Sequence, residues 1–335
     1  MITISVCMIV KDEEKNLAAC LDGLTQIADE IIIVDTGSTD ATKNIASQYT
    51  DKIYDFAWTG SFSDARNFAF SKAGMEYIYS ADADERLDEE NIERFLTLKQ
   101  TLLSEIEIVQ MYYCNQLENN TIYSFDKEYR PKLYKRIRTF TWQEKIHEAV
   151  NLEPIVYDSD IEIIHKPHGD HGKRDLQIFA DMILNEEPLS KRLIELYGKE
   201  VFIVGGQDDL NVAGPFFAEL TETAICGEDQ DMLKRACCIA ARYYRMKNDV
   251  SSFFKYALRV TACESCSEMC YEIGMFYMDK QDFQEAGMWF YNAAFETQPL
   301  LSISYQERMS LEKLAECCRQ NGDEESAAIY LQKIK

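Results

Sequence analysis

The sequence predicts two domains: an α/β domain with a Rossmann-like mixed sheet flanked by helices, followed by an all-α domain of helical repeats. From residue 1 to about 166, short β-rich runs alternate with amphipathic helical stretches, which is typical of a parallel or mixed sheet covered by helices. Beyond about residue 170 the strand signals fade and the pattern is that of successive helices. A chain of 335 residues with 46% hydrophobic residues is long enough for two such domains.

Four strands are expected in the first part of the chain, with helices between them. The strands run from Ile2 to Val10, Ile31 to Val34, Ile53 to Trp58 and Tyr77 to Ser80. The helices include one with an apolar face of Leu17, Leu21 and Leu24, and one from Asp64 to Ala73. The segment 36–40 supplies a turn glycine and hydroxyl N-caps for a further helix. Acidic residues follow the second and fourth strands, at the edge where open α/β sheets bind ligands.

A repeat is visible in the second half of the chain. It consists of an aspartate followed seven residues later by an aromatic residue, in the pairs Asp249 and Tyr256, Asp282 and Trp289, and Asp323 and Tyr330. The interval between the first two aspartates is close to the helix-turn-helix period of tetratricopeptide repeats, and the second interval is longer. Plain antiparallel helix hairpins would give similar spacing. In either case we expect a helical interaction module.

Charge and composition exclude several classes of partner. The net charge of −23, from 58 acidic and 35 basic residues, repels the phosphates of nucleic acid and of anionic lipids. The first residues lack a basic segment followed by an apolar one, and no apolar run reaches the length of a membrane span. We therefore expect neither export nor a membrane span, and a cytoplasmic location.

The 11 cysteines fit buried thiols in a reducing compartment, because most lie in apolar periodic stretches. Cys263, Cys266 and Cys270 have a spacing that could hold zinc, although no fourth ligand lies close in the sequence. The same spacing places them on one face of a helix. We expect a thiol-lined core face at this point.

The chemistry of the first half centres on Asp82, Ala83 and Asp84 after the fourth strand. The chain has neither a G-x-G-x-x-G nor a G-x-x-x-x-G-K-[ST] motif, so dehydrogenase and P-loop functions lose their main support. In an extended segment, residues i and i+2 point the same way, so both carboxylates could face one Mg²⁺ or Mn²⁺ ion and its phosphate ligands. An isolated Asp-x-Asp in an acidic protein could equally be a polar loop.

Several sequence blocks together resemble the family 2 inverting glycosyltransferases, which have the GT-A fold. The blocks are residues 5–13 (SVCMIVKDE), 31–40 (IIIVDTGSTD), 62–67 (FSDARN) and 82–85 (DADE). They occur in the order of the family. The resemblance implies a nucleotide-sugar donor, commonly UDP-linked, Mn²⁺ or Mg²⁺ as cofactor, and single-displacement transfer with inversion at the anomeric carbon.

The resemblance also implies site residues. Those implied to bind the nucleotide sugar are Val10, Glu13, Asp35, Arg66, Asp82 and Ala83, and those expected to hold the metal are Asp84, Asp82 and His165. Asp35 is expected to accept a hydrogen bond from the base, and Arg66 to reach the base or the diphosphate. Alternatively, Asp35 and Glu13 cap turns, and Arg66 pairs with Asp64 on the helix surface.

The general base is expected in the segment from Trp142 to Glu148. It resembles the Ile/Val-His-Glu segment of bacterial family members with helical C-terminal repeats, which include peptide S-glycosyltransferases. Glu148 could be the base and His147 a metal or phosphate contact, or His147 could itself be the base.

Two further polar segments are candidates for the site. His165, His168 and His171 follow an expected strand from Ile161 to Ile164, and His165 could complete the metal shell while the others form a polar linker. The basic run from Arg130 to Arg138 could contact donor phosphates or an acidic acceptor, or could be a solvated strand edge.

We therefore predict three regions: a GT-A catalytic domain over 1–170, a helical connector over 171–212 and a tetratricopeptide-like domain over 213–335. The predicted activity is transfer of a sugar from a UDP-sugar to a peptide or protein side chain, with a possible homodimer through the helical domain. The alternatives are a saccharide or lipid-linked acceptor, and a non-catalytic helical-repeat scaffold.

Overall fold

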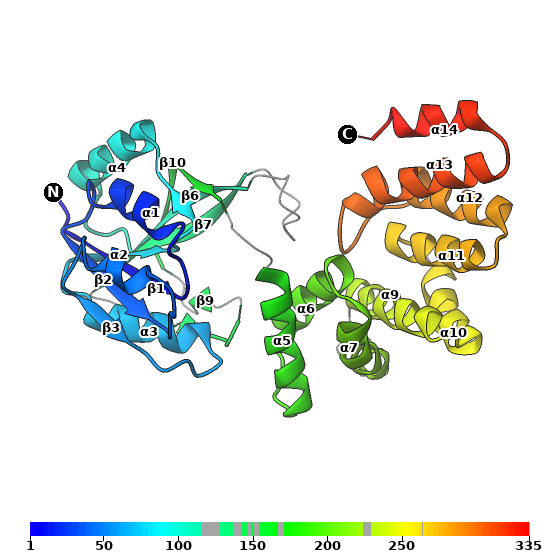
Figure 1. Cartoon of the computed structure of the whole chain (residues 1–335), viewed down its shortest axis with the longest axis horizontal. Helices are drawn as coiled ribbons and strands as arrows, with labels where there is room; N and C mark the ends of the chain where they lie inside the picture. Colours follow the sequence, from blue (N-terminus) through cyan, green and yellow to red (C-terminus); the bar gives the residue numbers. More distant parts are fainter. Residues whose placement is uncertain are drawn as a thin grey trace. The chain divides into compact units, whose positions relative to one another are not determined.

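The computed structural model of the chain divides into two compact units, Met1–Asp170 and His171–Lys335 (Figure 1). The residues that it describes are 1–115, 127–136, 142–146, 149–150, 154–166, 171–223, 229–262 and 264–334. No helix in these ranges is both long and apolar enough to cross a bilayer. Each unit has its own secondary-structure class, α/β in the first and all-α in the second.

The N-terminal unit is built on an eight-stranded mixed sheet with the strand order β3-β2-β1-β4-β7-β6-β10-β5. The strands of this sheet are β1 (Ile4–Val10), β2 (Glu30–Asp35), β3 (Ile53–Asp55), β4 (Tyr77–Ala81), β5 (Glu85–Arg86), β6 (Ile108–Asn115), β7 (Lys127–Lys135) and β10 (Val156–His165). The first four run parallel to one another, and β7 runs antiparallel to both of its neighbours, β4 and β6. The short strands β8 (Trp142–Gln143) and β9 (Ala149–Val150) form a separate antiparallel pair.

The helices of this unit cover both faces of the sheet (Figure 1). They are α1 (Leu17–Leu24), α2 (Thr42–Ala46), α3 (Phe62–Lys72) and α4 (Glu89–Thr101). Side chains alternate between the two faces along each central strand, so that Tyr79 packs in the core with Leu21 of α1 and Phe95 of α4. Ile78 packs on the opposite face with Phe70 of α3. This two-sided burial explains why the central strands are almost wholly apolar.

The four strands predicted between Ile2 and Ser80 are confirmed, with small differences at their ends. One expectation was wrong, and one of the alternatives left open is excluded. The hydroxyls of segment 36–40 do not cap α2, because Ser38 and Thr39 bond to Asp12 instead and the N-cap residue is Ala41. The alternative of a solvated strand edge fails for the part of the basic run in β7, because β7 lies inside the sheet between β4 and β6.

The C-terminal unit consists of successive helices. They are α5 (His171–Leu184), α6 (Lys191–Ile203), α7 (Gln207–Leu220), α9 (Gln230–Met246), α10 (Val250–Thr261), α11 (Ser267–Asp279), α12 (Phe283–Tyr291), α13 (Ser310–Gln320) and α14 (Glu324–Leu331), with the π-helical turns η2 (Asn292–Glu296) and η3 (Tyr305–Met309). Three antiparallel hairpins follow one another along the chain, α9 with α10, α11 with α12, and α13 with α14 (Figure 1).

The aspartates of the predicted repeat mark the same place in each hairpin. Asp249, Asp282 and Asp323 are the N-caps of α10, α12 and α14, and each accepts a hydrogen bond from the backbone N–H three residues later. The residue before each aspartate has positive φ, which allows the tight turn out of the preceding helix. The longer second interval contains η2, η3 and the connection between them. The prediction of helical hairpins is confirmed, and the irregular spacing has a structural cause.

Two of the cysteines considered for zinc lie in the core of this unit. Cys266 and Cys270 are buried, and the Sγ atom of Cys266 lies 3.5 Å from that of Cys238. Cys263 falls outside the described residues. Within the described ranges, no group of three or more His, Cys, Asp or Glu side chains is arranged to hold a metal ion. The two thiols are buried as expected, but they do not share a helix face, because Cys266 is the N-cap of α11 and only Cys270 lies within it.

Candidate active site

Two loops at the carboxyl edge of the sheet are tied together. The loop after β1 and the loop after β2 exchange hydrogen bonds: the Asp12 N–H donates to Ser38 Oγ at 2.9 Å, and the Thr39 N–H donates to Asp12 Oδ1 at 2.7 Å. The Glu13 N–H donates to Thr42 Oγ1 at 2.7 Å. These bonds hold the two loops as one wall of the site.

Asp35 ends β2 behind this wall and is 1% exposed. Its Oδ1 accepts the N–H groups of Gly37 and Ser38, both at 2.9 Å. Its Oδ2 is buried without a hydrogen-bond partner, which costs free energy unless a donor is supplied. The turn-capping alternative therefore describes one oxygen of Asp35, and the other oxygen remains available for a donor.

Val10 and Glu13 lie beside Asp35 with structural contacts of their own. Val10 pairs with Asp35 across β1 and β2, and its carbonyl accepts the N–H of Thr36 at 2.9 Å. The Glu13 carboxylate accepts a bond from the Asn16 side chain at 3.0 Å. Both residues line the same edge as Asp35, and their ligand contacts stay a prediction.

Arg66 reaches the acidic motif from α3. Its guanidinium donates to Asp82 Oδ1 at 2.9 Å and to Ser80 Oγ at 3.0 Å. Asp64, the alternative partner, instead accepts a bond from the Thr59 hydroxyl. Arg66 thus points into the site from the helix.

The acidic motif is a turn and not an extended segment, which corrects the geometry expected for it. β4 ends at Ala81, and the Glu85 N–H donates back to the Asp82 carbonyl at 3.1 Å. The turn forms because β5 folds back to pair with β10. As a result Asp82 and Asp84 have different partners: Asp82 pairs with Arg66, and Asp84 lies 3.0 Å from the Nε2 atom of His165. Ala83 between them is buried.

Each carboxylate of this turn has a cationic or potentially cationic neighbour. The Lys132 ammonium of β7 lies 2.6 Å from Glu85 and 3.8 Å from Asp82. Burial alone would raise the pKa of Asp82, but Arg66 and then Lys132 outweigh it and hold that pKa well below its usual range. Burial raises the pKa of Glu85 to about 7, with Lys132 opposing the rise and Asp82 adding to it. Asp82 is therefore the fixed negative charge of the turn.

Asp84 and His165 form the part of the site that suits a divalent cation. Asp84 Oδ2 and His165 Nε2 are hydrogen-bonded to each other at 3.0 Å, and a carboxylate oxygen and an imidazole nitrogen are both donor atoms that divalent cations accept. The His165 ring also packs on Tyr113, with ring centroids 5.0 Å apart. Two protein ligands leave coordination positions for phosphate oxygens and for water. The residues therefore fit a Mg²⁺ or Mn²⁺ ion that is held jointly by the protein and by a bound phosphate group.

His147, Glu148 and His168 lie outside the described residues. Lys132 and Glu85 were not singled out from the sequence, although the basic run contained the first and the acidic block the second. Lys132 is 5% exposed because the end of β7 is buried on both faces, with Leu133 and Tyr134 buried beside it, and no local pattern in the sequence marks this.

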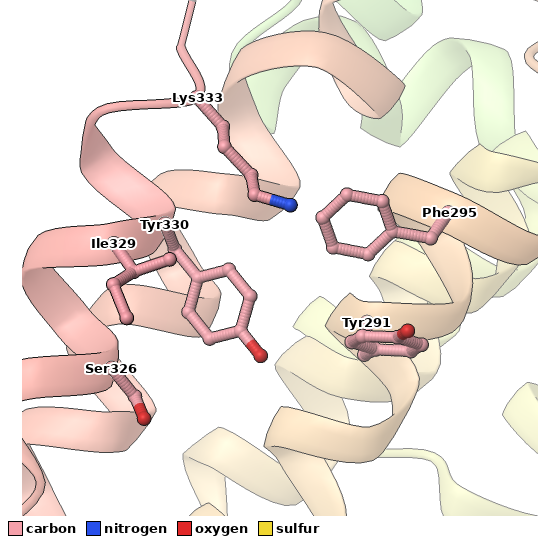
Figure 2. A pocket seen from close by; sticks show the side chains of 6 residues that line it. All are labelled: Tyr291, Phe295, Ser326, Ile329, Tyr330 and Lys333. Atoms are coloured by element: carbon pink, nitrogen blue, oxygen red, sulfur yellow. The ribbon is translucent and has the colours of Figure 1, made fainter.

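The C-terminal unit carries an open hollow of about 300 Å³ (Figure 2). It lies between α12 with η2 and α14, and is lined by Tyr291, Phe295, Ser326, Ile329, Tyr330 and Lys333. Its lining is mixed: three aromatic rings and Ile329 lie beside the Ser326 hydroxyl and the Lys333 ammonium, which is 4.9 Å from the centre of the Phe295 ring.

The family model described as "Glycosyl transferase family 2" matches residues 5–173, which is half of the chain. The chain therefore belongs to glycosyl transferase family 2, and its N-terminal unit has the GT-A fold. That fold is followed by an all-α unit of helical hairpins, as the sequence predicted.

The chain is also similar to several curated proteins. A TPR repeat-containing protein of Synechococcus elongatus is 42% identical over 87 residues, covering 26% of this chain and 22% of that protein. An uncharacterized glycosyltransferase of Rickettsia typhi is 28% identical over 176 residues, covering 49% and 56%. The SPbeta prophage-derived glycosyltransferase SunS of Bacillus subtilis is 25% identical over 227 residues, covering 62% and 51%. The chain thus spans between about a fifth and just over half of the length of these relatives.

Among solved structures, the chain resembles Staphylococcus aureus TarS with a TM-score of 0.43 and 17% identity, over 76% of this chain and 54% of TarS. It resembles glucosyl-3-phosphoglycerate synthase from Mycobacterium tuberculosis, solved with Mg²⁺ and uridine diphosphate, with a TM-score of 0.39 and 13% identity, over 56% and 81%. TM-scores below 0.5 give these likenesses no weight for function.

Proposed function

We propose that the protein is an active inverting glycosyltransferase that moves a sugar from a UDP-sugar to a peptide or protein side chain. The observation that carries the proposal is the acidic turn 82–85 at the carboxyl edge of the sheet, where Arg66, Lys132 and His165 converge on its carboxylates. Ligands of open α/β sheets bind at this edge. A scaffold without catalysis would not need this convergence.

We place the nucleobase of the donor against Asp35. A pyrimidine ring such as uracil presents an N–H group, which would satisfy the buried Oδ2 atom that has no partner. The atom is closed to solvent in the free protein, so the covering atoms must shift slightly on binding. The joined loops after β1 and β2 would then hold the nucleoside between them.

The diphosphate of the donor is placed between the acidic turn and Arg66. Asp84 and His165 would hold Mn²⁺ or Mg²⁺, which stabilises the charge that develops on the departing nucleoside diphosphate. Arg66 offers a fork of donors to phosphate oxygens, and Asp82 keeps that fork oriented through its 2.9 Å bond. Transfer also needs a base, and its assignment to Glu148 or His147 stays a prediction.

The acceptor is placed on the helical unit. Its hairpins resemble tetratricopeptide repeats, which present extended binding surfaces, and aromatic side chains such as those lining the hollow are common anchors at protein interfaces (Figure 2). A peptide or protein is the acceptor that such a unit suits. The predicted connector over 171–212, the homodimer and the cytosolic location stay predictions.

A thermal-shift screen tests the donor half of this proposal. We expect one UDP-sugar to raise the melting temperature in the presence of Mn²⁺ and to do so much less in EDTA, because a ligand at a hundred times its dissociation constant stabilises the native state by about 2.7 kcal/mol. GDP- and CDP-sugars serve as matched controls for the base. No shift with any nucleotide sugar would contradict the enzyme assignment.

Shortening the chain tests the acceptor half. A protein of residues 1–170 keeps a complete unit with its own core, so we expect it to retain slow donor hydrolysis and to lose transfer to polypeptide. Transfer should return in part when residues 171–335 are added separately at high concentration, since the linkage only raises the effective concentration. Unchanged transfer by the shortened protein would show that the helical unit does not dock the acceptor.

A further inference from the structure

We propose that Asn67 and Trp142 are positioning residues that hold the Arg66 guanidinium in the donor site. This inference rests on the proposed function only in its choice of ligand. Arg66 and Asn67 are adjacent on α3 and point to different neighbours: Arg66 bonds to Asp82, and Asn67 bonds to Trp142. Helix α3 thus joins the acidic turn 82–85 to Trp142, which follows Asn67 by 75 residues in the chain.

The Asn67 amide forms two hydrogen bonds with the backbone of one residue. Its Oδ1 accepts the Trp142 N–H at 2.7 Å, and its Nδ2 donates to the Trp142 carbonyl at 2.9 Å. Only an amide side chain offers a donor and an acceptor side by side, as a neighbouring strand would. A second tie lies at the start of the same helix, where the Phe62 N–H donates to the Lys145 carbonyl at 2.8 Å.

The two hydrogen bonds from Asn67 hold Trp142 where its indole lies against the Arg66 guanidinium. The Arg66 guanidinium carbon lies 5.2 Å from the centre of the Trp142 ring, within the range of a cation–π interaction. The ring is held in turn by Phe70 and Tyr134, whose centroids lie 5.8 and 5.6 Å away. Its Nε1 atom is buried without a hydrogen-bond partner, so the ring is held by these two T-shaped aromatic contacts and by its backbone. Arg66 is therefore confined between an aromatic wall, Ser80 and Asp82.

The first test measures UDP binding in Mn²⁺ with Trp142 as the reporter. Trp58→Phe and Trp289→Phe leave it as the single tryptophan, because the chain has three. In this background we expect Asn67→Leu and Asn67→Asp to raise the dissociation constant roughly three- to thirtyfold, the range that a lost cation–π contact corresponds to. Acrylamide should quench Trp142 more strongly in both variants before UDP is added.

Trp142→Phe, in the wild-type background, keeps a ring and should retain most of the affinity, whereas Trp142→Leu should not.

The outcomes separate this inference from the proposed function. Folded Asn67→Leu and Trp142→Leu proteins that bind UDP as tightly as the wild type would overturn the positioning role and leave the enzyme assignment intact. If the wild type itself does not bind UDP, the donor assignment fails. A double-mutant cycle then tests whether Asn67 and Arg66 are energetically coupled. Arg66→Met and Asn67→Leu should then change the free energy of unfolding non-additively, and additive effects would overturn the coupling.

Discussion

Replacing Asp84 by Asn should reduce glycosyl transfer at least about a hundredfold while the protein stays folded. Asp84 lies in the turn after β4, and its carboxylate has His165 as its close neighbour at 3.0 Å. The change keeps the volume of the side chain and removes the charge that a divalent cation needs. The backbone bond from the Lys166 N–H to the Asp84 carbonyl does not depend on the side chain, so the turn should persist.

The measurement is the transfer rate across a Mn²⁺ titration, with UDP affinity measured by calorimetry in Mn²⁺ and in EDTA. Asp51→Asn is a matched control, because Asp51 is an exposed aspartate before β3, and it should leave both quantities unchanged. In the Asp84→Asn protein we expect UDP affinity to become insensitive to EDTA. Wild-type turnover in that variant, or full wild-type activity in excess chelator, would remove the metal from the mechanism.

The fold could be predicted because its central strands are short, apolar and separated by amphipathic helices. Ile31 to Val34 is buried on both faces, as a parallel strand between helix layers must be. In the second half, Asp249 and its equivalents marked every turn between paired helices because capping is a local interaction. Local chemistry and periodicity therefore carried the prediction of both units.

The details of the site depend on pairings that no local pattern contains. Lys132 meets Glu85 because β7 inserts antiparallel beside β4, and nothing in either segment specifies that neighbour. The turn at Asp82 exists because β5 pairs with β10, a strand that lies far along the chain. Motif spacing therefore selected the acids of the candidate site, while their partners and their geometry required the tertiary structure.

Replacing Glu272 by Ala should lower the free energy of unfolding of the helical unit by about 3–5 kcal/mol. Glu272 of α11 is fully buried and accepts bonds from Arg242 at 2.7 Å and Arg245 at 2.9 Å, both on α9. Arg242 also donates to the Tyr305 hydroxyl of η3 at 2.7 Å. Removing the carboxylate leaves the mostly buried Arg242 guanidinium without its counter-charge, whereas Arg245 keeps its bond to Asp279 at 2.9 Å. A unit of this size should melt roughly 10 °C lower.

Glu312→Ala is the matched control, since its bond to Arg308 has nearly the same length, 2.9 Å, but lies on the surface. We expect this variant to lose less than about 1 kcal/mol. Equal losses in the two variants would show that burial does not determine the strength of these pairs. Circular dichroism during thermal unfolding measures both.

The pH dependence of the Glu272 contribution follows from its pKa. Burial alone would raise that pKa, but Arg242 and Arg245 outweigh it, so the pKa in the folded protein lies below the ordinary glutamate value. A depressed pKa means that the stabilisation is complete above the unfolded value of about 4.3 and is lost as the pH falls through the folded value. The melting temperatures of the wild type and Glu272→Gln should therefore differ by a constant amount near neutral pH and converge below about pH 4. A difference that persists unchanged into strong acid would mean that Glu272 acts through packing and not through its charge.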